Sequence, residues 1–174
     1  MLPTFKYHPN PIETGAIKES DAICECCSEG RGYIYTASIY SSEEVEAICP
    51  WCIADGSAAE KFDGSFSDDY PLIDDGIAPE IIDVVTKRTP GFSSWQQEVW
   101  LSCCNDACEF HGDASISDVK EMTLDVFQAA FEDRSLTVDF LSEFKRHYAP
   151  GGNPAIYKWI CGQCGSVRYY ADFT

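Results

Sequence analysis

Basic residues are scarce in this sequence. Lysine and arginine together number 12, against 29 aspartates and glutamates, which gives a formal net charge of -17. Because nucleic-acid binding depends on Lys and Arg side chains that neutralise phosphates, this balance excludes a direct nucleic-acid ligand. The same balance disfavours an anionic membrane surface. A cationic partner, or simply high solubility, is the expectation that remains.

Histidine is also rare: the chain has only His8, His111 and His147. A general base or a catalytic zinc site therefore has few residues to draw on. The His-x-Glu pattern that a zinc deaminase needs does not occur. The sequence therefore predicts a protein that is not an enzyme.

Long apolar runs are missing as well. No stretch of the sequence approaches the roughly 20 apolar residues that span a bilayer. Residues 1–11 show neither the apolar core nor the small-residue cleavage site of a signal peptide. We therefore expect a cytoplasmic protein with no membrane partner.

Cysteine, in contrast, is abundant, with 10 residues. Persistent disulfides are rare in a reducing cytoplasm, so metal ligation explains the cysteines better. Zinc prefers a tetrahedron of ligands, and a C-x-x-C turn supplies two thiolates from one bend. Two such turns, Cys24/Cys27 and Cys49/Cys52, are separated by 21 residues that can form a β-hairpin. We predict that these four cysteines bind one zinc ion in a treble-clef-like module.

A second zinc site is predicted from four further cysteines: Cys104, Cys108, Cys161 and Cys164. The turn Cys161-Gly-Gln-Cys164-Gly is typical of a zinc knuckle, because its glycines let backbone amides point at the sulfurs. With four protein ligands, neither site has an open position for water or substrate. Both zinc ions are therefore expected to be structural.

The spacing leaves some ligands open. The Cys104-x-x-x-Cys108 half of the second site is less typical than a C-x-x-C turn, so Cys103 or His111 can take the place of one of its ligands. Cys26 is likewise a spare thiol beside the first site.

The pattern of apolar and turn residues predicts an α+β fold in a single compact domain over residues 1–174. The first zinc module is expected over residues 20–62. The second combines residues 100–112 with residues 155–174, where a strand, a cysteine turn and a strand predict a zinc-ribbon-like hairpin. Residues 78–148 are expected to be mainly helical and to pack the two modules together, with helices over 79–87, 117–131 and 136–148.

Three weaker local signals complete the expected structure. A capping box of Ser41 and Glu44 predicts a helix that begins near Ser42, and a short helix is expected over residues 94–101. Residues 63–76, rich in Asp, Gly and Pro, are expected to form an exposed acidic loop. Its four aspartates are weak candidates for contacting a cationic partner: Asp68, Asp69, Asp74 and Asp75.

Several segments resemble the CbrC family of bacterial proteins. They begin with FKYHPNP (5–11), and the two most specific are the CECC block with the following RGYIYT (31–36) and CPWCIADGSAAEKF (49–62). Others are TPGFSSWQQEVWL, CNDACEFHG and the terminal CGQCG, so the resemblance covers nearly the whole chain. Cys104 and Cys108 match the family pattern better than Cys103 and His111. The family is named after a protein linked to tolerance of a DNase-type colicin, so the resemblance implies defence against a toxin.

The leading hypothesis is a non-enzymatic tolerance or immunity factor that binds a basic, nuclease-type toxin. A surface with a net charge of -17 can compete for the cationic surface of a nuclease and steer fast association. Two alternatives stay open. The turn Cys49-Pro-Trp-Cys52 resembles the active site of a glutaredoxin, which suggests a thiol–disulfide oxidoreductase. The other is a zinc-ribbon adaptor in a stress or transcription complex.

Overall fold

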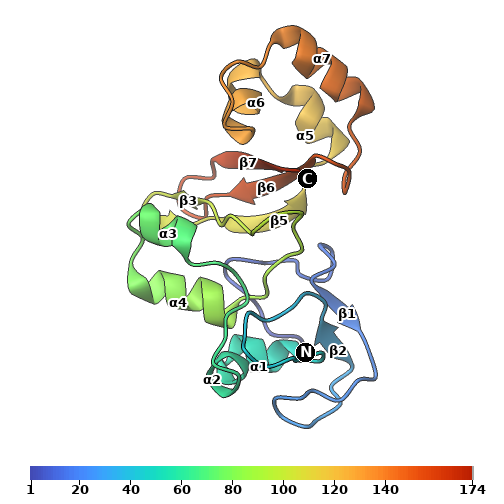
Figure 1. Ribbon diagram of the computed structural model, residues 1–174, viewed down its shortest axis with the longest axis vertical. Coiled ribbons are helices and arrows are strands. Elements are labelled where there is room, and N and C mark those ends of the chain that lie inside the picture. The colour runs from blue at the N-terminus through green and yellow to red at the C-terminus, as the bar shows by residue number, and fades with distance from the viewer. Residues whose placement is uncertain (174) are drawn as a thin grey trace.

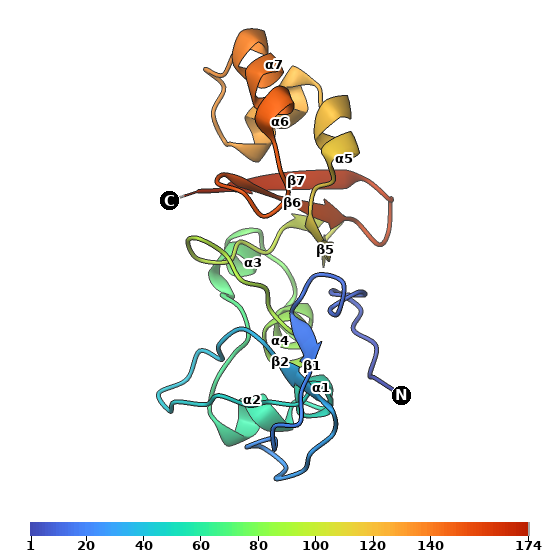
Figure 2. The same cartoon turned by 90° about the vertical axis from the view of Figure 1, so that its right-hand side faces the viewer.

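The computed structural model describes residues 1–173, whose elements form the mixed α+β fold that was expected. Three lobes are stacked along the long axis of the molecule (Figure 1). An N-terminal lobe (residues 12–66) lies at one end, a three-stranded sheet lies in the middle, and a helical lobe (residues 114–149) covers the far face of the sheet (Figure 2). The longest helices have 10 residues. Within the described residues, none is long and apolar enough to cross a membrane.

The N-terminal lobe is built from two short strands and two short helices: β1 (Ile17–Glu19), β2 (Tyr33–Tyr35), α1 (Pro50–Ala54) and α2 (Ser57–Lys61). The strands are antiparallel, with Ile17 opposite Tyr35. α1 begins with Pro50, whose ring fixes a helical φ where no backbone N–H is needed. Gly56, with a φ of 83°, separates the two helices, because the left-handed region it occupies is open to glycine.

The helix expected near Ser42 is absent, because the backbone groups of this segment find partners elsewhere. The hydroxyl of Ser41 donates to the carbonyl of Phe62 rather than capping a helix. The carboxylate of Glu25 accepts from the amides of Glu46 (2.8 Å) and Ala47 (2.9 Å). The amide of Tyr35 donates to the carbonyl of Ile48 at 2.8 Å. These contacts hold the chain extended until Cys49 and outweigh a local capping signal.

The middle of the molecule contains a hairpin and a sheet. Two helices pack against them: α3 (Tyr70–Asp74) and α4 (Pro79–Arg88). The hairpin joins β3 (Ser102–Cys103) to β4 (Asp106–Ala107), and the sheet has the order β5 (Glu109–Asp113), β6 (Ala155–Ile160), β7 (Val167–Asp172). All neighbours are antiparallel, and the pair of Ile160 with Val167 closes the β6–β7 hairpin that the sequence predicts. The sheet rests on packed aromatic rings, among them Phe92 stacked on Phe110 at 4.1 Å.

The helical lobe contains three helices: α5 (Ile116–Glu121), α6 (Leu124–Ala130) and α7 (Val138–His147). The single helix expected over residues 117–131 is broken, because Met122 adopts an extended backbone and the Thr123 hydroxyl caps a new helix by accepting from the Val126 amide. Helices are the commonest elements over residues 78–148, but they are not the only ones. Besides α4 to α7 these residues contain β3, β4 and β5, and the helix expected over residues 94–101 does not form.

Asp118 fastens α5 to the sheet. Its carboxylate lies 2.7 Å from the ammonium of Lys158 on β6 and also accepts from the amide of Ser115. Burial opposes ionisation of Asp118, but these partners outweigh it and lower the pKa of Asp118 from 3.8 to about 2. The carboxylate therefore stabilises the fold above pH 3.8, and this contribution disappears as the pH falls towards 2.

We expect Asp118→Asn to lower the free energy of unfolding by on the order of 2 kcal/mol near neutral pH. Because protonated Asp118 has lost its charge, the difference between variant and parent should shrink between pH 4 and pH 2. Urea unfolding of both proteins at matched pH values measures it. A difference that is constant over this range would contradict the assignment to charge. The hydrogen bond from the Ser115 amide at the start of α5 would then be its cause.

Candidate metal centres

Four cysteine thiols meet in the N-terminal lobe, and we call them cluster 1: Cys24, Cys27, Cys49 and Cys52. Their sulfur atoms all lie within 4.8 Å of one another, with 3.5 Å between Cys49 and Cys52 and 3.9 Å between Cys27 and Cys49. A disulfide would require about 2.05 Å, so the thiols are not bonded to one another. Four sulfurs bound at about 2.3 Å to a tetrahedral zinc ion lie about 3.8 Å apart. The grouping agrees with the sequence prediction, and the spacing fits a metal ion.

A turn and a helix start position cluster 1. Cys24 and Cys27 lie on a tight turn, closed by the amide of Ser28, which donates to the carbonyl of Cys24 at 2.7 Å. Cys49 is the last extended residue before α1, and Cys52 follows one helical turn later. Residues three apart at a helix start lie on the same face, so both thiols point at the turn. The amide of Cys49 donates to the sulfur of Cys24 at 3.2 Å and joins the two halves.

Burial sets the electrostatics of cluster 1. Cys24 and Cys49 are each only 1% exposed. Burial raises the pKa of Cys49 to about 11 and raises the pKa of Cys52 further. Burial also opposes ionisation of Cys24, but backbone amides, first that of Cys27, outweigh it and lower the pKa of Cys24 to about 7. A metal ion would supply the positive charge that lets these buried thiols ionise together, so the grouping suits metal ligation.

A second group of thiols, cluster 2, forms between two hairpins: Cys103, Cys104, Cys161 and Cys164. The sulfur of Cys103 lies 3.7 Å from that of Cys104 and 3.8 Å from that of Cys164. Cys104 and Asn105 are the two central residues of the β3–β4 turn, with φ of 56° and 58°. Two-residue hairpin turns need a positive φ at both positions, which asparagine tolerates and cysteine rarely adopts. This backbone brings two adjacent cysteines to one cluster.

Cys108 does not belong to cluster 2, and this corrects the predicted ligand set. Cys103, which the sequence left as a substitute, takes its place. Cys108 lies two residues beyond Asp106, the partner of Cys103 in the hairpin, and its side chain is fully buried in the aromatic core. Its backbone is also engaged, because its amide donates to Leu101 and its carbonyl accepts from the indole of Trp100. The sequence signal for the correct ligand set is Asn105, because asparagine favours a two-residue turn and such a turn places Cys103 and Cys104 together.

The other two candidate ligands have partners outside the clusters. His111 Nε2 lies 3.3 Å from a carboxylate oxygen of Glu109. Cys26 lies beside cluster 1, with its sulfur 3.5 Å from the hydroxyl of Ser57. Among the described residues, neither side chain belongs to a metal-ligating group.

Cluster 2 is more exposed than cluster 1, and polar neighbours support the thiolate form of two of its cysteines, Cys103 and Cys164. Cys104 and Cys164 are exposed, whereas Cys161 is buried. The hydroxyl of Ser166, 3.2 Å from the sulfur of Cys164, stabilises the thiolate and is the main cause that lowers the pKa of Cys164 to about 6. The guanidinium of Arg168 donates to the sulfur of Cys103 at 3.6 Å. Solvent therefore reaches this centre more easily than the buried one.

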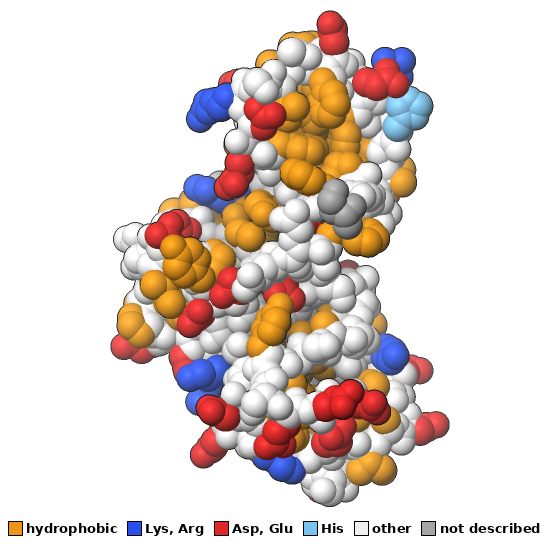
Figure 3. Space-filling model, in the orientation of Figure 1, with side chains coloured by type: hydrophobic (Ala, Val, Ile, Leu, Met, Phe, Trp, Pro, Cys, Tyr) orange, Lys and Arg blue, Asp and Glu red, His pale blue; other side chains and the backbone are white. Residues whose placement is uncertain are grey.

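The four predicted partner-binding aspartates lie at the two ends of α3 instead of in a loop: Asp68 and Asp69 precede the helix, Asp74 is its last residue and Asp75 follows it. The helix forms because Leu72 is fully buried beneath it. Tyr70 and Ile73 are 66% and 52% exposed on the same short helix. Apolar and acidic side chains thus share this surface, as the space-filling view shows over α3 (Figure 3).

The donor sets define the class of protein. Sulfur-only sites suit soft or borderline metal ions such as zinc, copper(I) or iron, and exclude magnesium and calcium. Four thiols in each cluster leave no open position at a tetrahedral metal ion. The chain is therefore an α+β protein with two four-cysteine clusters that can each hold a metal ion.

Comparison with known proteins places this class in a family. The model of an uncharacterised protein family, UPF0167, matches residues 2–173. The UPF0167 protein PA1536 of Pseudomonas aeruginosa is 48% identical over 175 residues, which cover 99% of this chain and 98% of the relative. The UPF0167 protein Mb2317 of Mycobacterium bovis is 40% identical over 176 residues, with 99% and 94% covered. The chain belongs to the UPF0167 family. No solved structure matches it.

Proposed function

We propose that this protein is a non-enzymatic binding protein, stabilised by two structural zinc ions, that uses its acidic surface to bind a cationic protein. The observation that carries the zinc assignment is the pair of closed four-thiol clusters with sulfur spacings of 3.5–3.9 Å. Zinc has no redox chemistry and is the usual ion of closed four-cysteine sites. Such a site contributes to folding and offers no position for a substrate.

The finer types of the two modules belong to this proposal. Cluster 1 joins a turn to the start of α1, which supports a treble-clef-like arrangement. Cluster 2 joins the turns of two β-hairpins, which supports a zinc-ribbon-like arrangement. That the chain also belongs to the CbrC family remains a prediction.

The partner in this proposal is a basic protein, and a nuclease-type toxin is the candidate that the CbrC resemblance implies. A net charge of -17 steers cationic proteins towards the chain. The α3 surface adds an exposed Tyr70 within a rim of carboxylates, and an exposed aromatic residue surrounded by polar groups is typical of an interaction hot spot. Charge would then govern the rate of association, and the apolar contact would govern the lifetime of the complex.

Paired variants with equal charge changes test the α3 surface. We expect Asp69→Asn with Asp74→Asn to slow association with a basic nuclease domain several-fold at low salt, because rim charges act on encounter rates. The matched control, Glu43→Gln with Glu44→Gln, changes the net charge equally at exposed residues elsewhere. Surface plasmon resonance against a panel of nuclease toxin domains, at low and high salt, measures both. No salt-sensitive binder in the panel, or equal slowing by both pairs, would contradict the proposed surface.

The oxidoreductase alternative requires an accessible Cys49. That thiol is 1% exposed and lies 3.5 Å from the sulfur of Cys52 within cluster 1. We expect no reaction of Cys49 with a thiol reagent in the zinc-loaded protein, because the sulfur is buried and bound. Mass spectrometry of the labelled protein decides this, and rapid labelling of Cys49 would favour redox catalysis. Co-purification with host complexes in the absence of toxin would favour the adaptor alternative.

A further inference from the structure

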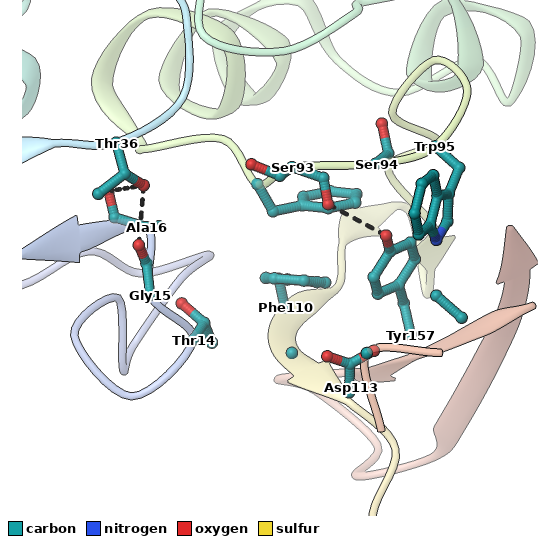
Figure 4. A pocket seen from close by; sticks show the side chains of 14 residues that line it. Thr14, Gly15, Ala16, Thr36, Ser93, Ser94, Trp95, Phe110, Asp113 and Tyr157 are labelled. Carbon is teal, nitrogen blue, oxygen red and sulfur yellow. Dashed lines mark hydrogen bonds between the residues drawn. The ribbon is translucent and has the colours of Figure 1, made fainter. Parts of the chain in front are cut away.

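A cavity outside both clusters lies between the N-terminal lobe and the central sheet (Figure 4). Its volume is about 360 Å³, and small-molecule sites occupy roughly 300–1,000 Å³. One wall is formed by residues 14–16 with Thr36, and the opposite wall by residues 92–95 with parts of β5 and β6. The cavity therefore brings together parts of the chain that are far apart in the sequence.

Aromatic rings line the side of the cavity formed by the sheet. Phe110 and Tyr157 lie on adjacent strands, with ring centroids 5.8 Å apart. Trp95 stands beside Tyr157 at the edge of the cavity (Figure 4) and is 53% exposed. Trp95 is also held in place, because its amide donates to the carboxylate of Asp172 and its indole N–H donates to the carbonyl of Gly152 at 3.3 Å. A fixed and half-exposed indole offers a flat surface to a planar molecule.

Among the described residues, Asp113 is the one acidic residue that lines the cavity, and no lysine, arginine or histidine lines it. Burial raises the pKa of Asp113, although the amide of Gly151 partly opposes this effect. No ion pair found within residues 1–173 includes this carboxylate. Asp113 is exposed, but its carboxylate borders the cavity without a counter-charge, and this disfavours an anionic ligand and favours a cationic one.

We propose that this cavity binds a small organic cation with a planar ring. Its ammonium group pairs with the carboxylate of Asp113, and its ring packs on the exposed face of Trp95, next to the largely buried rings of Phe110 and Tyr157. Electron-rich aromatic faces attract a cation directly, and a charge-assisted hydrogen bond to a carboxylate fixes its orientation. The proposal does not depend on zinc or on a protein partner, since it uses neither cluster nor the α3 surface.

Matched probes test the charge preference in the zinc-loaded full chain. Tryptamine and benzylamine are compared with their neutral counterparts, indole-3-ethanol and benzyl alcohol, and with the acid indole-3-acetate. Binding is followed by NMR through the indole N–H signal of Trp95 and the amide signals of Gly112 and Gly151, which line the cavity. We expect the two amines to shift these signals and the neutral and acidic probes to bind at least tenfold more weakly.

Two variants locate the site. Asp113→Asn keeps the size of the side chain and should weaken amine binding roughly tenfold or more, because a charged partner is lost. Asp125→Asn removes an exposed carboxylate on α6 and should leave binding unchanged. Trp95→Ala, read on the glycine amides, serves if the first variant does not fold, and it should also weaken binding. Unshifted signals at millimolar amine, equal binding of neutral or acidic probes, or full affinity in Asp113→Asn or Trp95→Ala would overturn the proposal.

Discussion

Replacement of Cys49 by serine should reduce the metal content from two ions per chain to one and unfold the N-terminal lobe. Cys49 contacts the rest of cluster 1 twice, through its sulfur and through its amide. Structural zinc supplies an apparent free energy of about 10–16 kcal/mol, whereas a whole domain is stable by only about 5–15 kcal/mol. The short elements of this lobe, none longer than five residues, cannot replace that contribution. Elemental analysis and hydrogen exchange of the amides in β1, β2 and α1 measure both effects.

Cys26 provides the control for this variant. Its thiol is half-buried and one residue away from the turn ligand Cys27, but it lies 3.5 Å from the hydroxyl of Ser57 and is not one of the four grouped thiols. Cys26→Ser should therefore retain two metal ions and protected amides in the N-terminal lobe. If Cys49→Ser kept both ions, or if Cys26→Ser lost one, the ligand set of cluster 1 would be wrong.

Cluster 1 could be predicted because its geometry is encoded locally. Each C-x-x-C pair lies within one turn of backbone. The hairpin expected between the pairs does not form, because β2 pairs with β1, which precedes Cys24. The expected helix near Ser42 failed for the opposite reason. Its capping pattern was real, but the segment satisfies its backbone through Glu25 and Tyr35, which are distant in the sequence. Tertiary hydrogen bonds override a weak local preference wherever a ligand such as Cys49 must be delivered in an extended conformation.

Two features in the middle of the molecule, α3 and the cavity near Asp113, depend on long-range packing and could not be predicted from the sequence. The acidic run at residues 63–76 forms α3 only because Leu72 inserts into a core that includes aromatic rings from β5 and β6. The cavity near Asp113 has no sequence signal at all, since its walls come from five separate segments. Spacing rules describe neighbours along the chain, and these features depend on neighbours in space.

Neighbours in space also explain why Cys103, and not Cys108, belongs to cluster 2. Cys103→Ser should abolish one metal site, because the Cys103 sulfur lies 3.7–3.8 Å from two other thiols of the cluster. The side chain is only partly buried, so the substitution itself disturbs little packing. Cys108→Ala should keep both metal ions and only lower the free energy of unfolding, by about 1 kcal/mol, as expected for a small cavity in a core. Metal content together with thermal unfolding of both variants measures this.

Reversal of this pattern, with the metal ion lost from Cys108→Ala and retained in Cys103→Ser, would restore the ligand set expected from the sequence. It would also leave the positive φ of Cys104 without an explanation. A positive φ at a residue other than glycine costs about 1–3 kcal/mol and persists only where the surroundings impose it. With Cys103 and Cys104 on one metal ion, the bond to the ion offsets that strain. Cys104→Gly, which relieves the strain but deletes a ligand, should therefore lose the second metal ion as completely as Cys103→Ser.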